Sequence, residues 1–154
     1  MSRHTVRWLA TGALLAGTLD ISYAIVFYSL RNHAPASRIL QSVATGLLGR
    51  ASFQGGAATA ALGLCLHFLI ATLITLVFYF AAQRIGFLTR HTVVSGILYG
   101  IGVYLVMNYV VIPLSAIHRF LPFDPVVAIT GILVHMFFIG IPIAWSVRKA
   151  LARG

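Results

Sequence analysis

The chain has 154 residues, of which 60% are hydrophobic and only 8% are charged, whereas an ordinary soluble domain is about 25% charged. This composition excludes a soluble monomer and a disordered chain, and the length allows only a few membrane crossings of about 20 residues each. The net charge of +9 does not indicate nucleic-acid binding, because the basic residues lie outside the apolar runs, where they can reach anionic lipid headgroups. We therefore predict one membrane domain, residues 1–154.

The first predicted span covers residues 8–30 and contains one charged residue, Asp20. A signal peptide would also begin with basic residues and an apolar run. Here, however, the run continues past Asp20 to Leu30, and no small-x-small cleavage motif follows it. We therefore expect this segment to remain uncleaved as a membrane helix.

The connection after the first span is the longest, and it contains an amphipathic segment at about residues 37–49. Ser37 is predicted to cap a helix that is too short to cross a bilayer. We expect this helix to lie in the membrane interface or to fold over the mouth of the bundle, and a solvated loop is the alternative. Its apolar side chains are Ile39, Leu40, Val43, Leu47 and Leu48, and the opposite face carries Arg38, Gln41, Ser42 and Thr45.

The other three predicted spans are residues 57–82, 92–114 and 125–147, and none contains Lys, Arg, Asp or Glu. At about 1.5 Å per residue each is long enough to cross the hydrocarbon core. Asp124 and Pro125 are suited to be the N-cap and the first residue of the last helix. The sequence thus predicts an all-α integral membrane four-helix bundle with a short amphipathic interfacial helix between spans 1 and 2.

The distribution of Lys and Arg predicts the orientation, because cytoplasmic segments carry more of them. Both ends and the second loop together carry seven, and the first and third loops carry four. We therefore expect both termini in the cytoplasm, with Trp8 and Trp145 at the same interface. The seven are Arg3, Arg7, Arg84, Arg90, Arg148, Lys149 and Arg153, and the four are Arg31, Arg38, Arg50 and Arg119.

Small residues share a helix face with the main polar side chain of each span. In membranes such faces are packing faces, because small residues let backbones approach closely. The predicted packing glycines are Gly17, Gly63, Gly96, Gly100 and Gly131. The second and fourth spans also share a glycine followed four residues later by a histidine, which suggests either a duplicated hairpin or only a shared composition.

The same spacing directs polar side chains into the bundle at similar depths. We predict a buried polar site of Asp20, His67, His135, Asn108 and Tyr23. A lone carboxylate in hydrocarbon is costly, whereas a neighbouring imidazole can share its proton and keep both groups hydrogen-bonded. Four interpretations remain: contacts that hold helices together, a proton or solute site, a divalent metal bound by Asp20, His67 and His135, and axial ligation of a haem.

No phosphate-binding loop, zinc-peptidase motif or nucleophile elbow occurs, so we expect no enzyme, and no cofactor is required. The single cysteine, Cys65, excludes an internal disulfide. The leading hypothesis is a small membrane protein with a proton-linked or solute-binding Asp/His site. The alternative is a non-catalytic assembly or stabilising partner. The expected partners are anionic lipids and either a second copy or another membrane protein, but no nucleic acid.

Several short stretches resemble a known group of proteins. They are the His67 span ending in aromatic residues, Gly96-Ile-Leu-Tyr-Gly100 leading to Ile112-Pro113-Leu114, and a last span with His135 before Arg148-Lys149. In these features the chain is similar to small bacterial four-span inner-membrane proteins, distantly of the YagU type. The resemblance implies a bacterial cytoplasmic membrane and no particular biochemistry.

Overall fold

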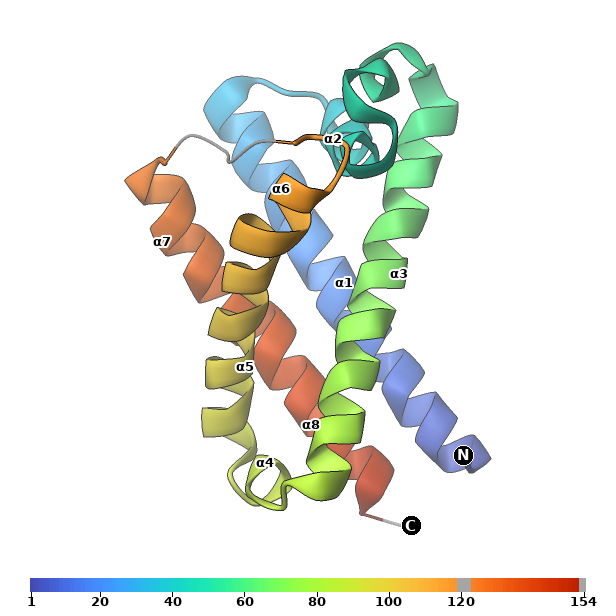
Figure 1. Ribbon diagram of the computed structural model, residues 1–154, viewed down its shortest axis with the longest axis vertical. Coiled ribbons are helices and arrows are strands. Elements are labelled where there is room, and N and C mark those ends of the chain that lie inside the picture. Colours follow the sequence, from blue (N-terminus) through green and yellow to red (C-terminus); the bar gives the residue numbers. More distant parts are fainter. Residues whose placement is uncertain (119–122, 153–154) are drawn as a thin grey trace.

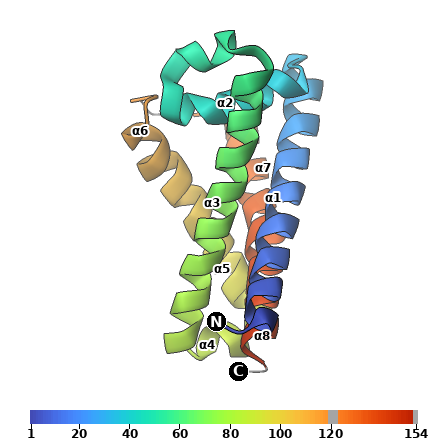
Figure 2. The ribbon, with the colours of Figure 1, turned by 90° about the vertical axis from the view of Figure 1, so that its right-hand side faces the viewer.

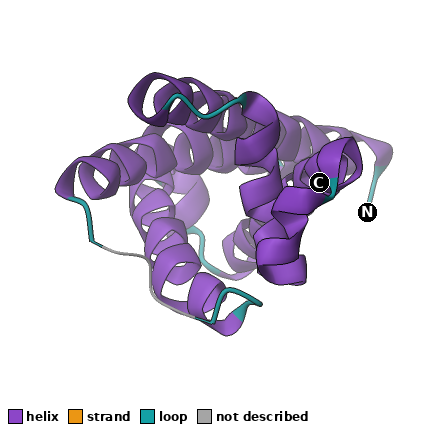
Figure 3. Cartoon of the chain, turned by 90° about the horizontal axis from the view of Figure 1, so that it is seen from above, coloured by secondary structure: helices purple, strands orange, loops and turns teal. Residues whose placement is uncertain are grey.

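The computed structural model describes residues 1–118 and 123–152, and within these ranges the chain is helical, with turns and no strand. Figure 3 accordingly shows only helices and loops. In chain order the elements are α1 (Arg3–Asn32), α2 (Ala36–Leu48), the 3₁₀ helix η1 (Gly49–Gln54), α3 (Gly56–Arg84), α4 (Phe87–Arg90), α5 (Thr92–Val106), the π-helix η2 (Met107–Val111), α6 (Ile112–Leu114), α7 (Pro125–Val134), the π-helix η3 (His135–Gly140) and α8 (Ile141–Leu151).

Four helical stretches are long and apolar enough to cross a membrane, which confirms the predicted number of candidate spans. They cover Arg3–Asn32, Gly56–Arg84, Thr92–Leu114 and Pro125–Leu151. Three of them extend past the predicted limits because amphipathic turns continue the helix beyond the apolar window. Both termini and α4 lie at one end of the bundle, and α2 and α6 lie at the other (Figure 1). Arg119 and Arg153, which entered the orientation count, lie outside the described residues.

Two of the helix starts were predicted from capping residues, with different outcomes. Asp124 accepts hydrogen bonds from the backbone N–H groups of Val126 and Val127 at 3.0 and 3.1 Å, and Pro125 begins α7, as predicted. The prediction for Ser37 was wrong, because α2 begins at Ala36 after Pro35. The α1 helix ends at Asn32, and His33 caps it in a left-handed conformation; Pro35, whose φ angle is restricted by its ring, is the N-cap of α2.

The α2 helix crosses the end of the bundle beside α3 (Figure 2). An ideal Cβ at Gly63 of α3 would overlap the backbone carbonyl of Leu40, so the two helices meet backbone to backbone. The predicted apolar face of α2 packs inward only in part: Ile39 is buried and Leu40 meets Gly63, but the face also includes exposed residues. Gln41 is buried and donates to the carbonyl of Gly56 at 2.9 Å, whereas Leu47 and Leu48 are 60% and 43% exposed.

The predicted packing glycines all lie at close contacts. Gly96 and Gly100 of α5 meet the backbone of the last span, where ideal Cβ atoms would run into Gly140 and His135. An ideal Cβ at Gly17 would lie 2.8 Å from Phe68, and one at Gly131 would lie 2.8 Å from Tyr104. These positions let the helices approach more closely than any larger residue would allow.

The hydrophobic core fills the end of the bundle that carries the termini. There α1, α3, α5 and α8 pack through a fully buried set of side chains, and the rings of Trp8 and Trp145 meet edge to face with centroids 5.2 Å apart. The core residues are Leu9, Ala16, Phe78, Tyr79, Ala82, Val103, Ile139, Ile143, Ala144, Val147 and Ala150. The opposite half of the bundle is where the structure leaves space.

Candidate binding site

A cavity of about 660 Å³ lies between the spans and is bounded at one end by α2, η1 and the segment after α6. This volume is in the range of small-molecule sites, which span roughly 300–1,000 Å³. Most of its wall is apolar, with Ile70 and Ile74 from α3 and Val103 from α5. The end of the cavity near α2 is held in place by a backbone hydrogen bond of 2.9 Å from Ala116 to Gly46.

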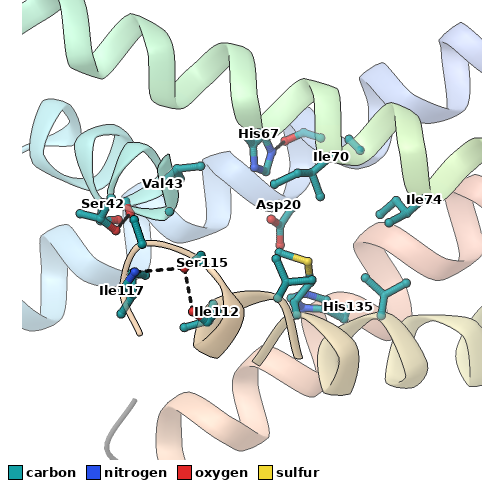
Figure 4. Close-up of a pocket in the computed structure, with 18 of the residues that line it drawn as sticks. Asp20, Ser42, Val43, His67, Ile70, Ile74, Ile112, Ser115, Ile117 and His135 are labelled. Carbon is teal, nitrogen blue, oxygen red and sulfur yellow. Dashed lines mark hydrogen bonds between the residues drawn. The ribbon is translucent and has the colours of Figure 1, made fainter. Parts of the chain in front are cut away.

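Three of the predicted site residues line this cavity from three different elements. Asp20 comes from α1, His67 from α3 and His135 from η3. Figure 4 shows all three in one view, with the carboxylate of Asp20 displayed between the two imidazole rings. They are brought together because each shares a helix face with the small residues that pack the bundle.

The expected direct pairing of Asp20 with a histidine is not formed. Among the described residues, Asp20 makes no hydrogen bond and no ion pair, and the salt bridge that does form joins Arg31 to Asp124 at 2.6 Å. The reason is that a nearer backbone acceptor holds each imidazole. The three groups therefore face a shared space and do not neutralise one another through direct contact.

His67 is held by a contact between two helices. Its Nε2 lies 2.8 Å from the backbone carbonyl of Gly17 in α1. A carbonyl oxygen can only accept, so Nε2 is the nitrogen that carries the proton and donates. The absence of a side chain at Gly17 leaves room for Phe68 beside this contact, because an added Cβ would lie 2.8 Å from the Phe68 ring.

His135 is held within its own span. Its Nδ1 lies 2.8 Å from the carbonyl of Gly131, one turn earlier, and therefore donates its proton to that oxygen. The two histidines thus have opposite tautomers. In each neutral ring the remaining nitrogen, Nδ1 of His67 and Nε2 of His135, is free to accept a hydrogen bond.

Two π-helical segments shape the cavity wall. The N–H of Ile112 bonds to Met107 and that of Ile141 bonds to Met136, each five residues back. Each wide turn directly precedes a proline, Pro113 or Pro142, which has no N–H and whose ring would press on the carbonyl four residues earlier. The first and fifth residues of each π segment face the cavity, namely Met107, Val111, His135 and Ile139.

The other two predicted site residues are not part of the cavity lining. The Nδ2 of Asn108 donates to the carbonyl of Tyr104 in its own helix at 2.9 Å. The ring of Tyr23 stacks on Phe27 with centroids 5.3 Å apart, and its buried hydroxyl has no hydrogen-bond partner within the part of the chain that the structure describes. A residue can therefore lie on the predicted inward face of its helix without lining the cavity.

Sequence analysis missed the polar residues that reach the cavity from outside the four spans. They are Ser42 and Thr45 of α2, Arg50 of η1 and Ser115 after α6. Ser42 and Thr45 were assigned to the solvated face of the amphipathic helix. Gly46 and Gly49 could have indicated this contact, since small residues in and after that helix let another segment approach closely.

A metal centre is not supported by the geometry. Over residues 1–118 and 123–152, no group of three His, Cys, Asp or Glu side chains lies close enough together to hold a metal ion. With His67 Nε2 and His135 Nδ1 both protonated and bonded to carbonyls, each ring has one nitrogen left for any ligand. The arrangement can therefore accept hydrogen bonds from three sides of a cavity with mostly apolar walls.

Comparisons with known protein families, with curated proteins and with solved structures returned no match. The resemblance to YagU-type proteins stays a hypothesis that rests on the short stretches quoted above.

Proposed function

We propose that this chain is a small multi-pass protein of the bacterial cytoplasmic membrane that binds a small, largely apolar solute in its cavity. The protonation of Asp20, His67 and His135 is linked to occupancy, and the protein acts by binding and not as an enzyme. The single observation that carries the proposal is that three ionisable side chains from three elements line one cavity of about 660 Å³. Ionisable residues inside membrane bundles are costly and mark functional sites by default.

In this proposal both termini face the cytoplasm and α2 lies in the opposite interface. The exposed Leu47 and Leu48 of α2 would then contact acyl chains, while Gln41 packs inward. Basic residues near the helix ends would contact anionic headgroups. A solute would reach the cavity from the α2 side, where Arg50, itself exposed, belongs to both the surface and the lining.

Cysteine labelling tests whether solutes in water reach the cavity. In a Cys65→Ser background, we expect Ile70→Cys, which lies in the cavity wall, to react with a water-soluble methanethiosulfonate reagent. The matched control is Leu73→Cys on the same helix, because Leu73 is 52% exposed on the outside of the bundle. In a lipid bilayer it should stay unreactive, since thiolates do not form in hydrocarbon. An unreactive Ile70→Cys would contradict a solute-accessible cavity.

A second experiment separates a binding site from a packing contact. Asp20→Asn keeps the shape of the side chain and removes its ionisation. We expect this variant to fold with a thermal midpoint near that of the wild type and with a weaker pH dependence of that midpoint. Thr18→Val, an isosteric change at an exposed position of α1, is the control and should keep both.

The alternative function, a non-catalytic assembly partner, is favoured by one observation. The hydrogen bond from His67 to Gly17 joins α3 to α1, as a purely structural polar contact would. On this alternative Asp20→Asn lowers the thermal midpoint and leaves its pH dependence unchanged. Either outcome of the same experiment therefore assigns the cluster to one of the two functions.

A further inference from the structure

Apart from Arg50, whose guanidinium can only donate, the polar side chains that line the cavity are left as hydrogen-bond acceptors. Ser42 Oγ donates to the carbonyl of Ile39 at 2.6 Å, and Ser115 Oγ donates to the carbonyl of Ile112 at 2.7 Å. Thr45 Oγ1 likewise donates to the carbonyl of Ser42. Each hydroxyl hydrogen is therefore used inside its own segment, and only oxygen lone pairs remain for a ligand. Figure 4 shows this for Ser115, whose Oγ also accepts from the N–H of Ile117 at 3.3 Å.

The two histidines follow the same rule. Their protonated nitrogens are taken by Gly17 and Gly131, so a neutral His67 offers Nδ1 and a neutral His135 offers Nε2, both as acceptors. The carboxylate of Asp20 is also an acceptor, and it has no hydrogen-bonded or ionic partner in the described part of the chain. A ligand that fits this lining has to supply hydrogen-bond donors.

The charged residues of the lining also favour a ligand that donates hydrogen bonds. The chain has two acidic residues, and Asp124 is paired with Arg31 at 2.6 Å, which leaves Asp20 as the acidic side chain without an ionic partner among the described residues. The other fixed charge on the lining is Arg50, which belongs to η1 at the α2 end and has an exposed side chain, so that water screens it. The inner part of the cavity therefore favours one positive charge beside Asp20.

We propose that the cavity binds an organic ammonium ion, a primary or secondary amine with a compact apolar body. This inference rests on the proposed function and specifies its substrate class. The ammonium N–H groups donate to Asp20 and to the free nitrogens of His67 and His135, and the apolar body lies against Ile70, Ile74 and Val103. Because the ammonium and a proton compete for the same carboxylate, acid weakens binding.

The test uses four probes with the same adamantyl body, added to wild-type protein in lipid nanodiscs and measured by isothermal titration calorimetry against empty nanodiscs. They are 1-adamantylammonium, its N,N,N-trimethyl derivative, 1-adamantanol and 1-adamantanecarboxylate. We expect the ammonium to bind at least about tenfold more tightly than the trimethyl cation, which has the charge but no N–H donor. The alcohol should bind more weakly than the ammonium, and the carboxylate should bind weakest.

Variants then locate the interaction. Asp20→Asn should abolish the preference for the ammonium over the alcohol, while Thr18→Val on the outer face of the same helix should keep it. Acidification should weaken ammonium binding to the wild type, because protons compete for the same carboxylate. In Asp20→Asn this weakening should be smaller.

The outcomes distinguish this inference from the function on which it rests. Suppose that Ile70→Cys is labelled but the trimethyl cation, the alcohol or the carboxylate binds as tightly as the ammonium. Solutes then reach the cavity, and the proposal that its ligand is an organic ammonium ion is wrong. The same conclusion follows if Ile70→Cys is labelled and the ammonium does not bind. If Ile70→Cys is unreactive and no probe binds, the binding function itself is overturned.

Discussion

The tautomers of the two histidines determine what the cavity offers to a ligand. Both rings are fixed by backbone carbonyls of glycines, Gly17 for His67 and Gly131 for His135. The carbonyls are the cause of the arrangement, because a group that only accepts forces the imidazole nitrogen beside it to carry the proton. The residue types were visible in the sequence, but which nitrogen stays free depends on which carbonyl each ring meets.

These tautomers can be measured directly. In protein labelled with ¹⁵N-histidine, we expect the His67 ring to be protonated at Nε2 and the His135 ring at Nδ1 at neutral pH. His67→Gln should remove the first set of signals and His135→Gln the second. Exposed histidines such as His91 provide the reference for a ring without a fixed carbonyl contact. Two buried rings with the same tautomer would contradict the geometry of the lining.

At the scale of the elements, the position of α2 depends on a single glycine. Gly63→Ala would place a Cβ inside the carbonyl of Leu40, and neither backbone can move without separating α2 from α3. We expect a loss of about 1–3 kcal/mol of stability, the usual cost of overpacking. The change should also expose residues 49–56 to limited proteolysis, because α2 holds this turn in place.

The matched control is another helical glycine. At Gly102 of α5 an added Cβ meets no atom within 4 Å. Gly102→Ala should therefore leave stability unchanged or raise it by up to about 1 kcal/mol, through the higher helix propensity of alanine. Thermal unfolding of the two variants side by side measures the difference. Equal destabilisation by both would show that the contact with Leu40 is unimportant.

Some features of the helices could be predicted from the sequence, and others could not. Three of the four spans followed from charge-free windows and the first from a window with Asp20 as its one charge, since burying a charge in hydrocarbon is costly. The inward face of α2 followed from its pattern only in part. Gln41 is buried because it meets the carbonyl of Gly56, a partner supplied by the tertiary fold. The π-helices were also missed, although Pro113 and Pro142 marked their positions.

At the scale of the whole molecule, the arrangement of the ends makes a prediction about topology. Both termini lie at the end of the bundle opposite α2 (Figure 1), and if all four candidate spans cross the membrane, both termini are on the same side of it. Reporter fusions in bacteria measure which side this is. We expect fluorescent protein fused to either terminus to be active, and alkaline phosphatase to be active only when inserted near Gln54. Phosphatase activity at a terminus would reverse the orientation.

The site itself was predictable only in part. Helical spacing places Asp20, His67 and His135 on inward faces of three spans, and the structure has them lining one cavity. Spacing cannot tell whether inward groups touch, and these do not. Nor can it supply the lining from α2 and from the segment at Ser115, because both reach the cavity through contacts between residues far apart in the chain.

The space between the helices is packed with side chains at one end of the bundle and open at the other, and this difference affects whether a solute could cross the membrane. Toward the termini the space between helices is occupied by fully buried side chains such as Phe78 and Val147, and Gly12 leaves no room for even a methyl group beside Ser146. The cavity is therefore closed toward the termini by packed side chains. If the protein binds a solute as proposed, transfer to the other side of the membrane would require these packed helices to separate.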